Sequence, residues 1–380
     1  MPAVENPSRR ETGPRRVLVA ALLSVSLAGC ASAGNDERTF AKTPSLKATL
    51  GGHFLVGAAI EPWELDEPAD VTLLRKHFSS VTAENAMKPL TIAPHPGEYN
   101  FAPADQLVRF ARENSLQVRG HTLLWYKSAP AWLFEGDPTD AAAYRALVRR
   151  RLETYITDVA THFKGTVYAW DVVNEVVSDR PGETYRTNSP WYRALGPDYI
   201  EYAFRAARVA DPGAKLIIND YGTEQPAKRA RLMAIVRDLL AKGVPIDGVG
   251  HQLHLQIGAT APAVEEALGD VEKLGLINHV TELDISVYDD PGSCSVDGSG
   301  CRPDYGNDVP ASVLAAQAEL YGNLYRVFEA HPSVKSVTTW GVSDAHTWLD
   351  KFPVTRTNKP LLFDTARAPK DGFRAIVRRR

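Results

Sequence analysis

Short apolar runs alternate with longer stretches of helical periodicity from about residue 50 to the C-terminus. The apolar runs, each predicted to be a β-strand, are Phe54–Ile60, Ser79–Glu84, Gln117–Leu124, Val167–Val173, Lys215–Asn219, Gly248–His254, His279–Ile285 and Val334–Trp340. The helices predicted between them include Ala104–Asn114, Ala141–His162, Tyr199–Ala210, Lys228–Lys242, Val264–Lys273 and Val313–Ala330. Several of these end at an Asn or just before a Pro, for example at Asn114 and before Pro212, as helices commonly do.

Eight alternations of strand and helix, with strands that are apolar along nearly their whole length, predict parallel strands buried on both faces. Eight such units that close on themselves form a (β/α)8 barrel, the fold of a TIM barrel. The alternative is an open, doubly wound sheet, but no Gly-rich phosphate-binding loop follows the first strand. Since no linker or change in composition divides residues 46–380, we predict one catalytic barrel over that range.

The first 29 residues have the pattern of an export signal. Arg9, Arg10, Arg15 and Arg16 precede a mostly apolar run, Val17–Gly29. A charged region followed by a short apolar region is typical of a secretory signal, and this run is too short to span a bilayer as a helix. We therefore predict a signal peptide over residues 1–29. The paired arginines also suggest a twin-arginine route, which the residues after them fit poorly.

The apolar run ends in Leu27-Ala28-Gly29-Cys30, which resembles the bacterial lipobox. The resemblance implies cleavage before Cys30 and lipidation of its thiol; the alternative is an ordinary cleaved signal with an incidental cysteine. Several acyl chains on Cys30 would hold the protein to a membrane, whereas one chain binds only marginally. Residues 30–45 are predicted to be a polar tether. We expect an exported protein, lipid-anchored at the bacterial cell surface or the periplasmic face of a membrane, with no other membrane contact.

Composition narrows the class of protein further. The chain has 380 residues, 44% of them hydrophobic, and a formal net charge of -3. These values are ordinary for a soluble globular protein, and the lack of a basic excess argues against nucleic-acid binding. Cys294 and Cys301 bracket a Gly- and Ser-rich loop, and in an oxidising compartment we predict a disulfide between them rather than two free thiols. No Cys/His spacing matches a zinc site, so no metal is expected.

Polar, ionisable and aromatic residues gather where seven of the predicted strands end. In (β/α)8 barrels the carboxyl ends of the strands form the active site. The residues at these ends are Glu84, Asn85, Lys88, His121, Trp125, Asn174, Glu175, Asn219, Asp220, Tyr221, Gln252, His254, Glu282, Asp284, Trp340 and Trp348. Each alone could merely cap a loop or a helix, but their occurrence at seven strand ends favours one shared site.

Two of these carboxylates are placed to act on one bond. Cleavage of a glycosidic bond needs a proton donor for the leaving oxygen and a second carboxylate on the other side of the sugar. Glu175 and Glu282 end the fourth and seventh predicted strands, which lie across a barrel from each other. Asp220, Glu84 and Asp344 are rival carboxylates that spacing alone does not exclude.

The alternation of side chains along a strand predicts a second feature of this site. Gln252 and His254 share a face, and so do Glu282 and Asp284 on the next predicted strand. A hydrogen-bond chain from Asp284 through His254 to Glu282 is therefore possible, and it would orient Glu282 and keep it ionised. By the same alternation His251 points away from His254, so we expect it in the core and not in a metal site.

Six sequence strings, in this order along the chain, resemble glycoside hydrolase family 10, the endo-β-1,4-xylanases. They are Thr82-Ala83-Glu84-Asn85-Ala86-Met87-Lys88, Arg119-Gly120-His121-Thr122-Leu123-Leu124-Trp125, Trp170-Asp171-Val172-Val173-Asn174-Glu175, Thr281-Glu282-Leu283-Asp284, Trp340-Gly341-Val342-Ser343-Asp344 and Lys359-Pro360-Leu361-Leu362-Phe363-Asp364. The resemblance covers residues 46–375. It implies a retaining enzyme that hydrolyses the xylan backbone through a covalent glycosyl-enzyme. Separately, we expect no cofactor and a monomeric protein.

The resemblance also implies roles for individual residues. Glu175 matches the general acid/base and Glu282 the nucleophile. Asn174 matches a contact to the 2-hydroxyl, His254 and Asp284 match the pair that holds the nucleophile, and Gln252 matches a partner of the acid/base. The residues that match sugar-binding positions are Glu84, Asn85, Lys88, His121, Trp125, Trp340 and Trp348 on the non-reducing side of the cut, and Tyr221 on the leaving-group side.

The chain departs from the family pattern at two places. Tyr126-Lys127-Ser128 stands where His-Ser-Gln is usual, and Gly222 replaces a frequent asparagine. We therefore expect that some contacts to sugars, both next to the cleaved bond and farther from it, differ from those usual in the family. Two other functions remain alternatives: a related barrel glycanase acting on β-glucan or mannan, and a surface polysaccharide-binding protein without catalysis.

Overall fold

A computed structural model describes residues 43–378. The predicted signal peptide, Cys30 and most of the predicted tether lie outside this range. Ser45, the last residue assigned to the tether, accepts a hydrogen bond from the backbone N–H of Ala48 and so caps the first helix that is described. The described residues from Pro44 onward form one compact unit. Within residues 43–378, no helix is both long and apolar enough to cross a membrane.

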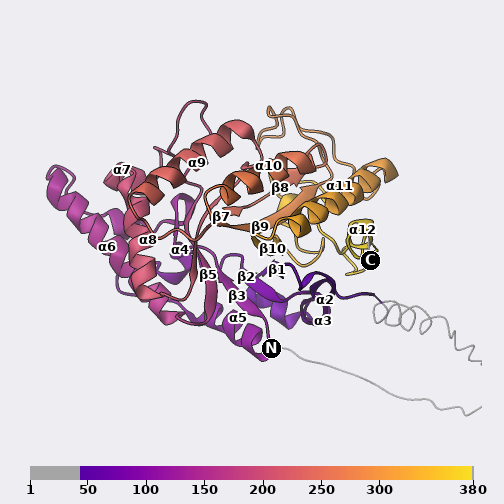
Figure 1. Cartoon of the computed structure of the whole chain (residues 1–380), viewed down its shortest axis with the longest axis horizontal. Coiled ribbons are helices and arrows are strands. Elements are labelled where there is room, and N and C mark those ends of the chain that lie inside the picture. Colours follow the sequence, from indigo (N-terminus) through magenta and orange to yellow (C-terminus); the bar gives the residue numbers. More distant parts are fainter. Residues whose placement is uncertain (1–42, 379–380) are drawn as a thin grey trace, which may run out of the picture. The chain divides into compact units, whose positions relative to one another are not determined.

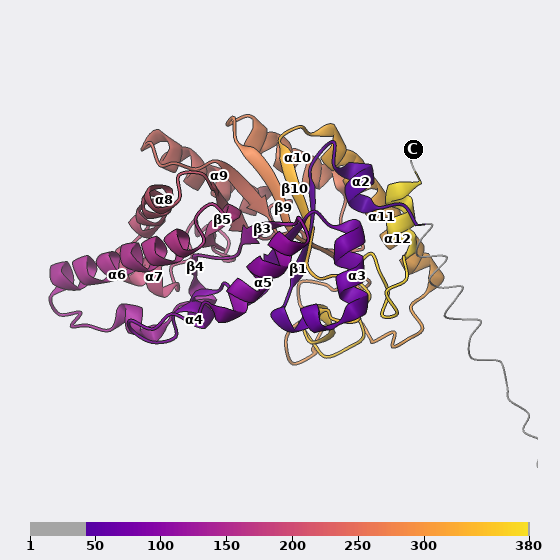
Figure 2. The ribbon, with the colours of Figure 1, turned by 90° about the horizontal axis from the view of Figure 1, so that it is seen from below.

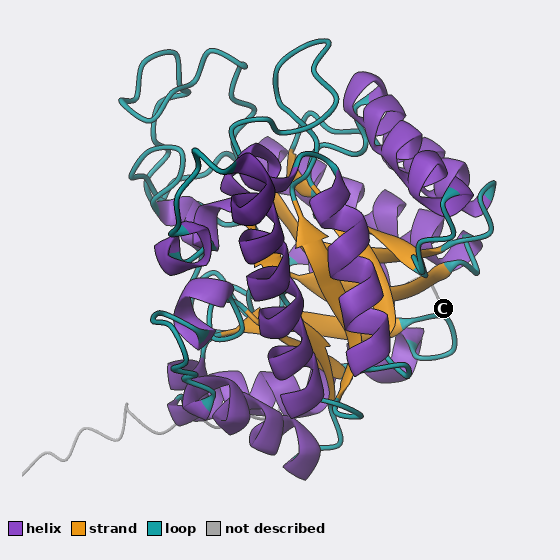
Figure 3. Ribbon diagram, turned by 90° about the vertical axis from the view of Figure 1, so that its left-hand side faces the viewer, coloured by secondary structure: helices purple, strands orange, loops and turns teal. Residues whose placement is uncertain are grey.

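The predicted (β/α)8 barrel is confirmed. The strands that form it are β1 (Leu55–Ile60), β2 (Ser80–Ala83), β3 (Gln117–Gly120), β5 (Val167–Asn174), β6 (Lys215–Asp220), β7 (Gly248–His251), β9 (Ile277–Ser286) and β10 (Val334–Thr339). Each pairs in parallel with the next, and β10 pairs with both β9 and β1, which closes the sheet. Figure 3 shows these strands in the middle of the molecule, with helices around them.

Two predicted strands are each divided in the structure. The third ends at Gly120 and is followed by the short β4 (Leu124–Trp125), which pairs with β5. The sixth ends at His251 and resumes as β8 (His254–Gln256), which pairs with β9. Between β7 and β8, Leu253 has a φ of 54°, a left-handed conformation that an extended strand does not contain. Both breaks fall at the carboxyl end of the barrel, where the predicted site lies.

The six predicted helices are all present, with ends that differ by a few residues. The α-helices of the described residues are α2 (Leu46–Leu50), α3 (Pro68–His77), α4 (Pro89–Ile92), α5 (Ala102–Glu113), α6 (Ala141–His162), α7 (Pro190–Leu195), α8 (Asp198–Ala210), α9 (Pro226–Ala241), α10 (Ala261–Glu272), α11 (Ala311–Ala330) and α12 (Asp371–Val377). The 3-10 helices are η1 (Pro62–Asp66), η2 (Tyr126–Ser128), η3 (Ala131–Phe134) and η4 (Trp348–Asp350). Figures 1 and 2 show α2, α11 and α12 grouped on one side of the barrel. Most of the helices not predicted are one or two turns long, too short to display a helical period.

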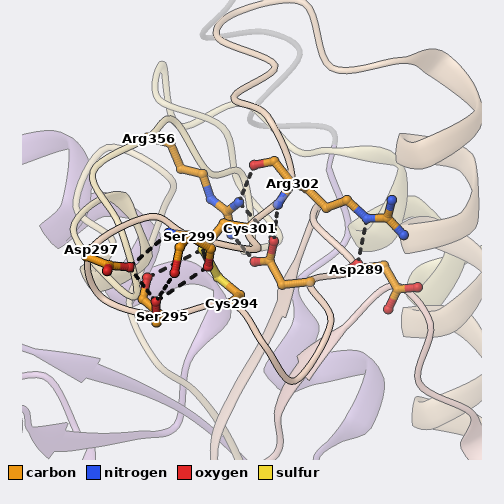
Figure 4. Close-up of a disulfide and its surroundings, with 9 residues drawn as sticks. Asp289, Cys294, Ser295, Asp297, Ser299, Cys301, Arg302 and Arg356 are labelled. Carbon is orange, nitrogen blue, oxygen red and sulfur yellow. Dashed lines mark hydrogen bonds and ion pairs between the residues drawn. A yellow bond between two sulfur atoms is a disulfide. The ribbon is translucent and has the colours of Figure 1, made fainter.

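The predicted disulfide is present between Cys294 and Cys301, in the loop that follows β9. A second set of contacts holds the same loop. Asp290 accepts hydrogen bonds from the backbone N–H of Arg302 and from the guanidinium of Arg356, which also donates to the carbonyl of Arg302. Figure 4 shows Arg356 and Arg302 beside the disulfide. The disulfide therefore closes the loop on itself, and the contacts of Arg356 fasten the loop to the 350–358 segment.

Candidate active site

A cleft of about 450 Å³ opens at the carboxyl ends of the barrel strands. Its lining includes both candidate catalytic glutamates, Glu175 after β5 and Glu282 on β9. The other lining residues are Glu84, Lys88, His121, Trp125, Lys127, Asn174, Tyr221, Gly222, Glu224, Gln225, Gln252, His254, Trp340, Trp348 and Phe352. Polar groups and aromatic rings in this mixture suit a ligand that has both hydroxyl groups and flat apolar faces.

The backbone of Glu175 is strained and is held on both sides. Its φ is 60°, a left-handed conformation that costs a residue other than glycine roughly 1 kcal/mol or more. Its N–H donates to the carbonyl of Asn219 at 2.8 Å, and its carbonyl accepts from Nε of Arg186 at 2.9 Å. Strain of this kind persists where the surroundings enforce it, and it turns the Glu175 side chain into the cleft.

Three side-chain amides connect the two glutamates. Nδ2 of Asn219 donates to Oε1 of Glu282 at 2.8 Å and to Oδ1 of Asn174 at 2.9 Å. Nε2 of Gln252 donates to the same Oδ1 of Asn174 at 3.1 Å and to Oε1 of Glu175 at 3.5 Å. A continuous row of hydrogen bonds thus links the carboxyl groups of Glu175 and Glu282, which places both at one site.

Glu282 lies at the end of a second hydrogen-bond chain, the one expected from the alternation of side chains. Nε2 of His254 is 3.2 Å from Oε2 of Glu282, and its Nδ1 is 3.0 Å from Oδ2 of Asp284. The indole N–H of Trp348 also donates to Oδ2 of Asp284, at 2.8 Å. Because both ring nitrogens of His254 face carboxylates, the chain is completed when the imidazole carries two protons.

Electrostatics favours a charged His254 and an ionised Glu282. Burial would lower the pKa of His254, but Asp284 and Glu282 together raise it to about 10. Burial would raise the pKa of Glu282, but its hydrogen bond from His254 and the charges of His121 and His254 hold that pKa below its usual value. Glu282 is therefore a carboxylate at neutral pH, the state that a nucleophile needs.

A buried ion pair lies beneath Glu282. The guanidinium of Arg119 makes a bidentate contact with the carboxylate of Asp171, with Nη1 at 2.5 Å from Oδ2, and both side chains are fully buried. Nδ1 of His121 lies 2.9 Å from Oδ2 of Asp171 and 3.9 Å from Oε1 of Glu282. Asp171 thus fixes the ring of His121 beside the predicted nucleophile.

The structure brings most of the predicted sugar-binding residues together. Glu84, Lys88, His121, Trp125, Tyr221, Trp340 and Trp348 all line the cleft. Asn85 is the exception: it is exposed, donates from Nδ2 to Oε1 of Glu61, and accepts from Nζ of Lys88 at 2.8 Å. Asn85 is placed to orient Lys88, which reaches into the cleft.

The rival carboxylates take different positions. Asp344 is buried in an ion pair with Lys370 at 2.7 Å and does not line the cleft. Asp220 is also fully buried outside the lining, and burial raises its pKa to about 6 despite an ion pair with Lys228 at 3.1 Å. Glu84 does line the cleft, where burial and nearby Glu61 raise its pKa.

His251 is buried, as expected. Its ring nitrogens contact the hydroxyl of Thr223 and the side-chain carbonyl of Asn278, each at 2.8 Å. Among residues 43–378, the one group of His, Cys, Asp and Glu ligands close enough for a metal is Asp290 with Cys294 and Cys301. The two sulfurs of that group are bonded to each other, so they are not available to an ion.

Sequence reasoning gave no role to three residues that organise the site. Asn219 joins the two halves of the amide row, Arg186 holds the backbone of Glu175, and Asp171 fixes His121. Asn219 was expected at the site from its place at a strand end, but without a role, and Asp171 could have been found from its place on β5. Arg186 comes from an irregular loop, and no sequence periodicity indicated it.

The departures from the family pattern have visible consequences. Nζ of Lys127 lies 3.9 Å from Oε2 of Glu175 and brings a positive charge into the cleft. The ring of Tyr126 packs against the guanidinium of Arg186, while Ser128 is buried and accepts from the backbone N–H of Leu90. Gly222 has a φ of 62°, a conformation that asparagine also tolerates, so the glycine keeps the backbone turn and removes a side chain from the cleft.

Comparison with known proteins agrees with this geometry. The chain is 41% identical over 377 residues to a thermostable celloxylanase of Thermoclostridium stercorarium, with 95% of this chain and 94% of the relative covered. It is 43% identical over 331 residues to endo-1,4-beta-xylanase A of Halalkalibacterium halodurans, with 83% and 80% covered.

Solved structures give the same result. Xylanase B from Clostridium stercorarium F9 superposes with a TM-score of 0.81 at 42% identity, over 88% of this chain and 99% of that one. A xylanase from Paenibacillus barcinonensis bound to a conduramine derivative superposes with a TM-score of 0.81 at 37% identity, over 88% and 98%. The sequence profile described as glycosyl hydrolase family 10 matches residues 45–379. The chain therefore belongs to glycosyl hydrolase family 10.

Proposed function

We propose that this protein is a retaining endo-β-1,4-xylanase that hydrolyses the backbone of xylan. The observation that carries the proposal is the row of amide hydrogen bonds that joins Glu175 and Glu282 in one cleft. Retaining glycosidases use two carboxyl groups about 5–5.5 Å apart, one as acid/base and one as nucleophile. The family's endo-xylanase relatives support xylan as the substrate.

In the first step, an oxygen of Glu282 attacks the anomeric carbon of the sugar on the donor side. The bond from that carbon to the bridging oxygen breaks, and Glu175 transfers its proton to the departing oxygen. The shortened chain leaves, and the donor remains as an ester on Glu282. The charged His254 and nearby His121 keep Glu282 ionised before attack, so its lone pair is available.

In the second step, Glu175 acts as a base. It takes a proton from a water molecule, whose oxygen attacks the same anomeric carbon and displaces Glu282. Two inversions at one carbon give net retention. The buried Oε2 of Glu175 has no hydrogen-bond partner among the described residues, and its nearest charge is Nζ of Lys127 at 3.9 Å. This oxygen can therefore hold the leaving oxygen's proton and later contact the water.

We assign the supporting residues from their hydrogen bonds. Oδ1 of Asn174 already accepts from Asn219 and Gln252, so its Nδ2 is the group left to donate to the 2-hydroxyl of the donor sugar. Glu84, Lys88, His121, Trp125, Trp340 and Trp348 bind donor sugars, Asn85 orients Lys88, and Tyr221 stacks on the acceptor side.

The proposal extends to domains and location. Residues 1–29 are an export signal, residues 30–45 a tether, and residues 46–380 the catalytic domain of a monomeric enzyme. Acyl chains on Cys30 anchor the protein to a membrane. Labelling with a radioactive fatty acid should mark the wild type and not Cys30→Ala, which should be released into the soluble fraction. An unlabelled wild type would leave an exported enzyme without an anchor.

The function is tested by reducing-sugar release from purified xylan, β-glucan and mannan. Xylan should be the preferred polymer, and NMR of the first products should show the β-anomer. Glu282→Ala should abolish release. Preference for β-glucan or mannan would assign a related glycanase instead, and binding of xylan by an inactive wild type would assign a polysaccharide-binding protein.

A further inference from the structure

A half-exposed tryptophan lies outside the cleft described above. Trp63 belongs to η1, the 3-10 helix that follows β1, and 50% of its surface is exposed. It lines a groove of about 530 Å³. The other residues of this groove are Pro62 and Asp66 of η1 and Ala102, Pro103 and Gln106 of α5. The groove combines an indole ring with a carboxylate and an amide.

Two separate series of contacts connect the groove with one end of the catalytic cleft. Glu61, next to Pro62, accepts a hydrogen bond from Asn85, which in turn binds Lys88 of the cleft. On the other side, the ring of Trp63 packs edge-on against His346 with centroids 4.6 Å apart. His346 lies two residues before Trp348, another cleft residue. Lys88 and Trp348 both belong to the donor side in the proposed function, so Trp63 lies beyond the donor end.

The indole ring of Trp63 is held in a fixed position by the packing of η1. The side chain of Glu64 accepts from the backbone N–H of Glu61 at 2.6 Å, which closes a capping box at the start of η1. The same 3-10 helix packs against both α3 and α5. Contact with His346 covers part of Trp63, and the groove leaves the rest open. A fixed aromatic surface of this kind costs little entropy when a ligand binds.

We infer that Trp63 and its groove form a distal donor subsite for a long β-1,4-linked xylan chain. The inference rests on the proposed function and adds to it a preference for long substrates. The flat C–H face of a xylopyranose stacks on the ring, and Asp66 and Gln106 exchange hydrogen bonds with its hydroxyl groups. The occupant is the non-reducing part of a chain whose cleaved bond lies between Glu175 and Glu282.

The test compares substrate lengths. Xylohexaose is long enough to occupy the distal subsite, whereas xylotriose is not. In Trp63→Ala, the ratio of kcat/KM for xylohexaose to kcat/KM for xylotriose should fall about 2- to 10-fold, the range expected for one lost aromatic contact. Trp63→Phe should retain part of that ratio. Val209→Ala is the control. This exposed apolar residue is at the last turn of α8, on the side where the chain enters β6 and not where the strands end in the cleft, and the change should leave the ratio unchanged.

The other possible results separate a failure of the distal subsite from a failure of the proposed function. An unchanged ratio in a folded Trp63→Ala would overturn the distal subsite, as would equal losses on both substrates, which indicate a structural defect. Should Trp63→Ala fail to fold, Gln106→Ala carries the test, with a smaller fall in the same ratio expected and an unchanged ratio counting against the subsite. If the wild type cleaves no xylo-oligosaccharide of any length, the proposed function itself fails and the distal subsite with it.

Discussion

Among single residues, Glu175 has the most specific expected phenotype. Glu175→Ala removes the proton donor, so kcat/KM for xylan should fall by about 10²- to 10⁴-fold. An aryl xylobioside with a good leaving group departs without protonation, and its kcat/KM, which reports the first chemical step, should fall far less. Steady-state kinetics on the two substrates measures the difference. Equal losses on both would contradict the acid/base role.

Arg186 is expected to act through Glu175. Its Nε and Nη2 donate to the carbonyls of Glu175 and Val177, each at 2.9 Å, and its Nη1 is 2.8 Å from Asp179. A lysine has a single ammonium group, which cannot contact both carbonyls and the Asp179 carboxylate in the way that the planar guanidinium does. Arg186→Lys should therefore lower kcat/KM on xylan by roughly 10-fold, for a loss of positioning, and spare the activated aryl substrate.

The control for that variant is Arg145→Lys, which alters a partly exposed ion pair with Asp198 and should change neither rate. A loss of the same size on both substrates in Arg186→Lys would mean that Arg186 supports only the fold of its loop.

The pH profile depends on His254. Because the pKa of Glu282 lies below its usual value, the carboxylate persists into acid, and kcat/KM should decline only below the ordinary pKa of a glutamate. His254→Asn removes the charge and the hydrogen bond that lower this pKa. The acid limb of kcat/KM should then move to higher pH. A limb that stays in place would show that His254 does not control the ionisation of Glu282.

Residue types and strand ends were enough to predict most of the residues that meet in the cleft, but not Glu224, Gln225 and Phe352, which lie in loops. The hydrogen bonds of His254 with Glu282 and Asp284 followed from side-chain alternation. The left-handed backbone of Glu175 did not, because conformational strain is imposed by contacts between distant segments. Arg186 was missed for the same reason: its partners lie in the loop after β5 and, at Tyr221, in the loop after β6.

At the scale of elements, strand periodicity located all eight barrel strands but not where two of them break. Leu253 looks like part of an apolar run in the sequence, yet its positive φ ends β7 and lets β8 pair separately with β9. The hydrogen bond from the N–H of Glu282 to the carbonyl of Gln252 lies next to this break. Such breaks arise from the geometry of neighbouring strands, which no single segment of sequence contains.

The loop after β9 allows a prediction about stability. Its disulfide closes a short loop, and such a crosslink contributes roughly 2 kcal/mol by restricting the unfolded chain. Replacing Cys294 and Cys301 by Ser should lower the free energy of unfolding by about that amount. Activity should be kept, because neither cysteine lines the cleft and Asp290 still binds Arg356.

Urea unfolding of the double variant and of the reduced wild type measures this effect. The two should agree with each other, and a reducing agent should have no effect on the variant. A variant as stable as the oxidised wild type would show that the ion pair of Asp290 with Arg356 alone holds the loop.

At the scale of the whole molecule, the barrel was predictable because every strand repeats one pattern of burial and no segment interrupts the series. The charged and polar side chains that fill the middle of the barrel were not predicted. The fully buried Arg119 lies on β3, its partner Asp171 on β5, and its Nε is 3.4 Å from Nδ1 of His279 on β9. Burial lowers the pKa of His279 to about 3, so its neutral ring accepts this hydrogen bond. One guanidinium therefore connects three strands through the middle of the barrel.

That connection should make the barrel sensitive to loss of a single charge. Asp171→Asn leaves the guanidinium of Arg119 buried without a counter-ion, and should lower the free energy of unfolding by about 3–5 kcal/mol. Replacing both residues, as Arg119→Met with Asp171→Leu, should cost less than the single change because no charge remains buried. Asp198→Asn, which breaks the exposed pair with Arg145, is the control and should cost under about 1 kcal/mol. Urea unfolding of the three variants gives the comparison, and equal effects of Asp171→Asn and Asp198→Asn would show that the buried pair does not hold the barrel together.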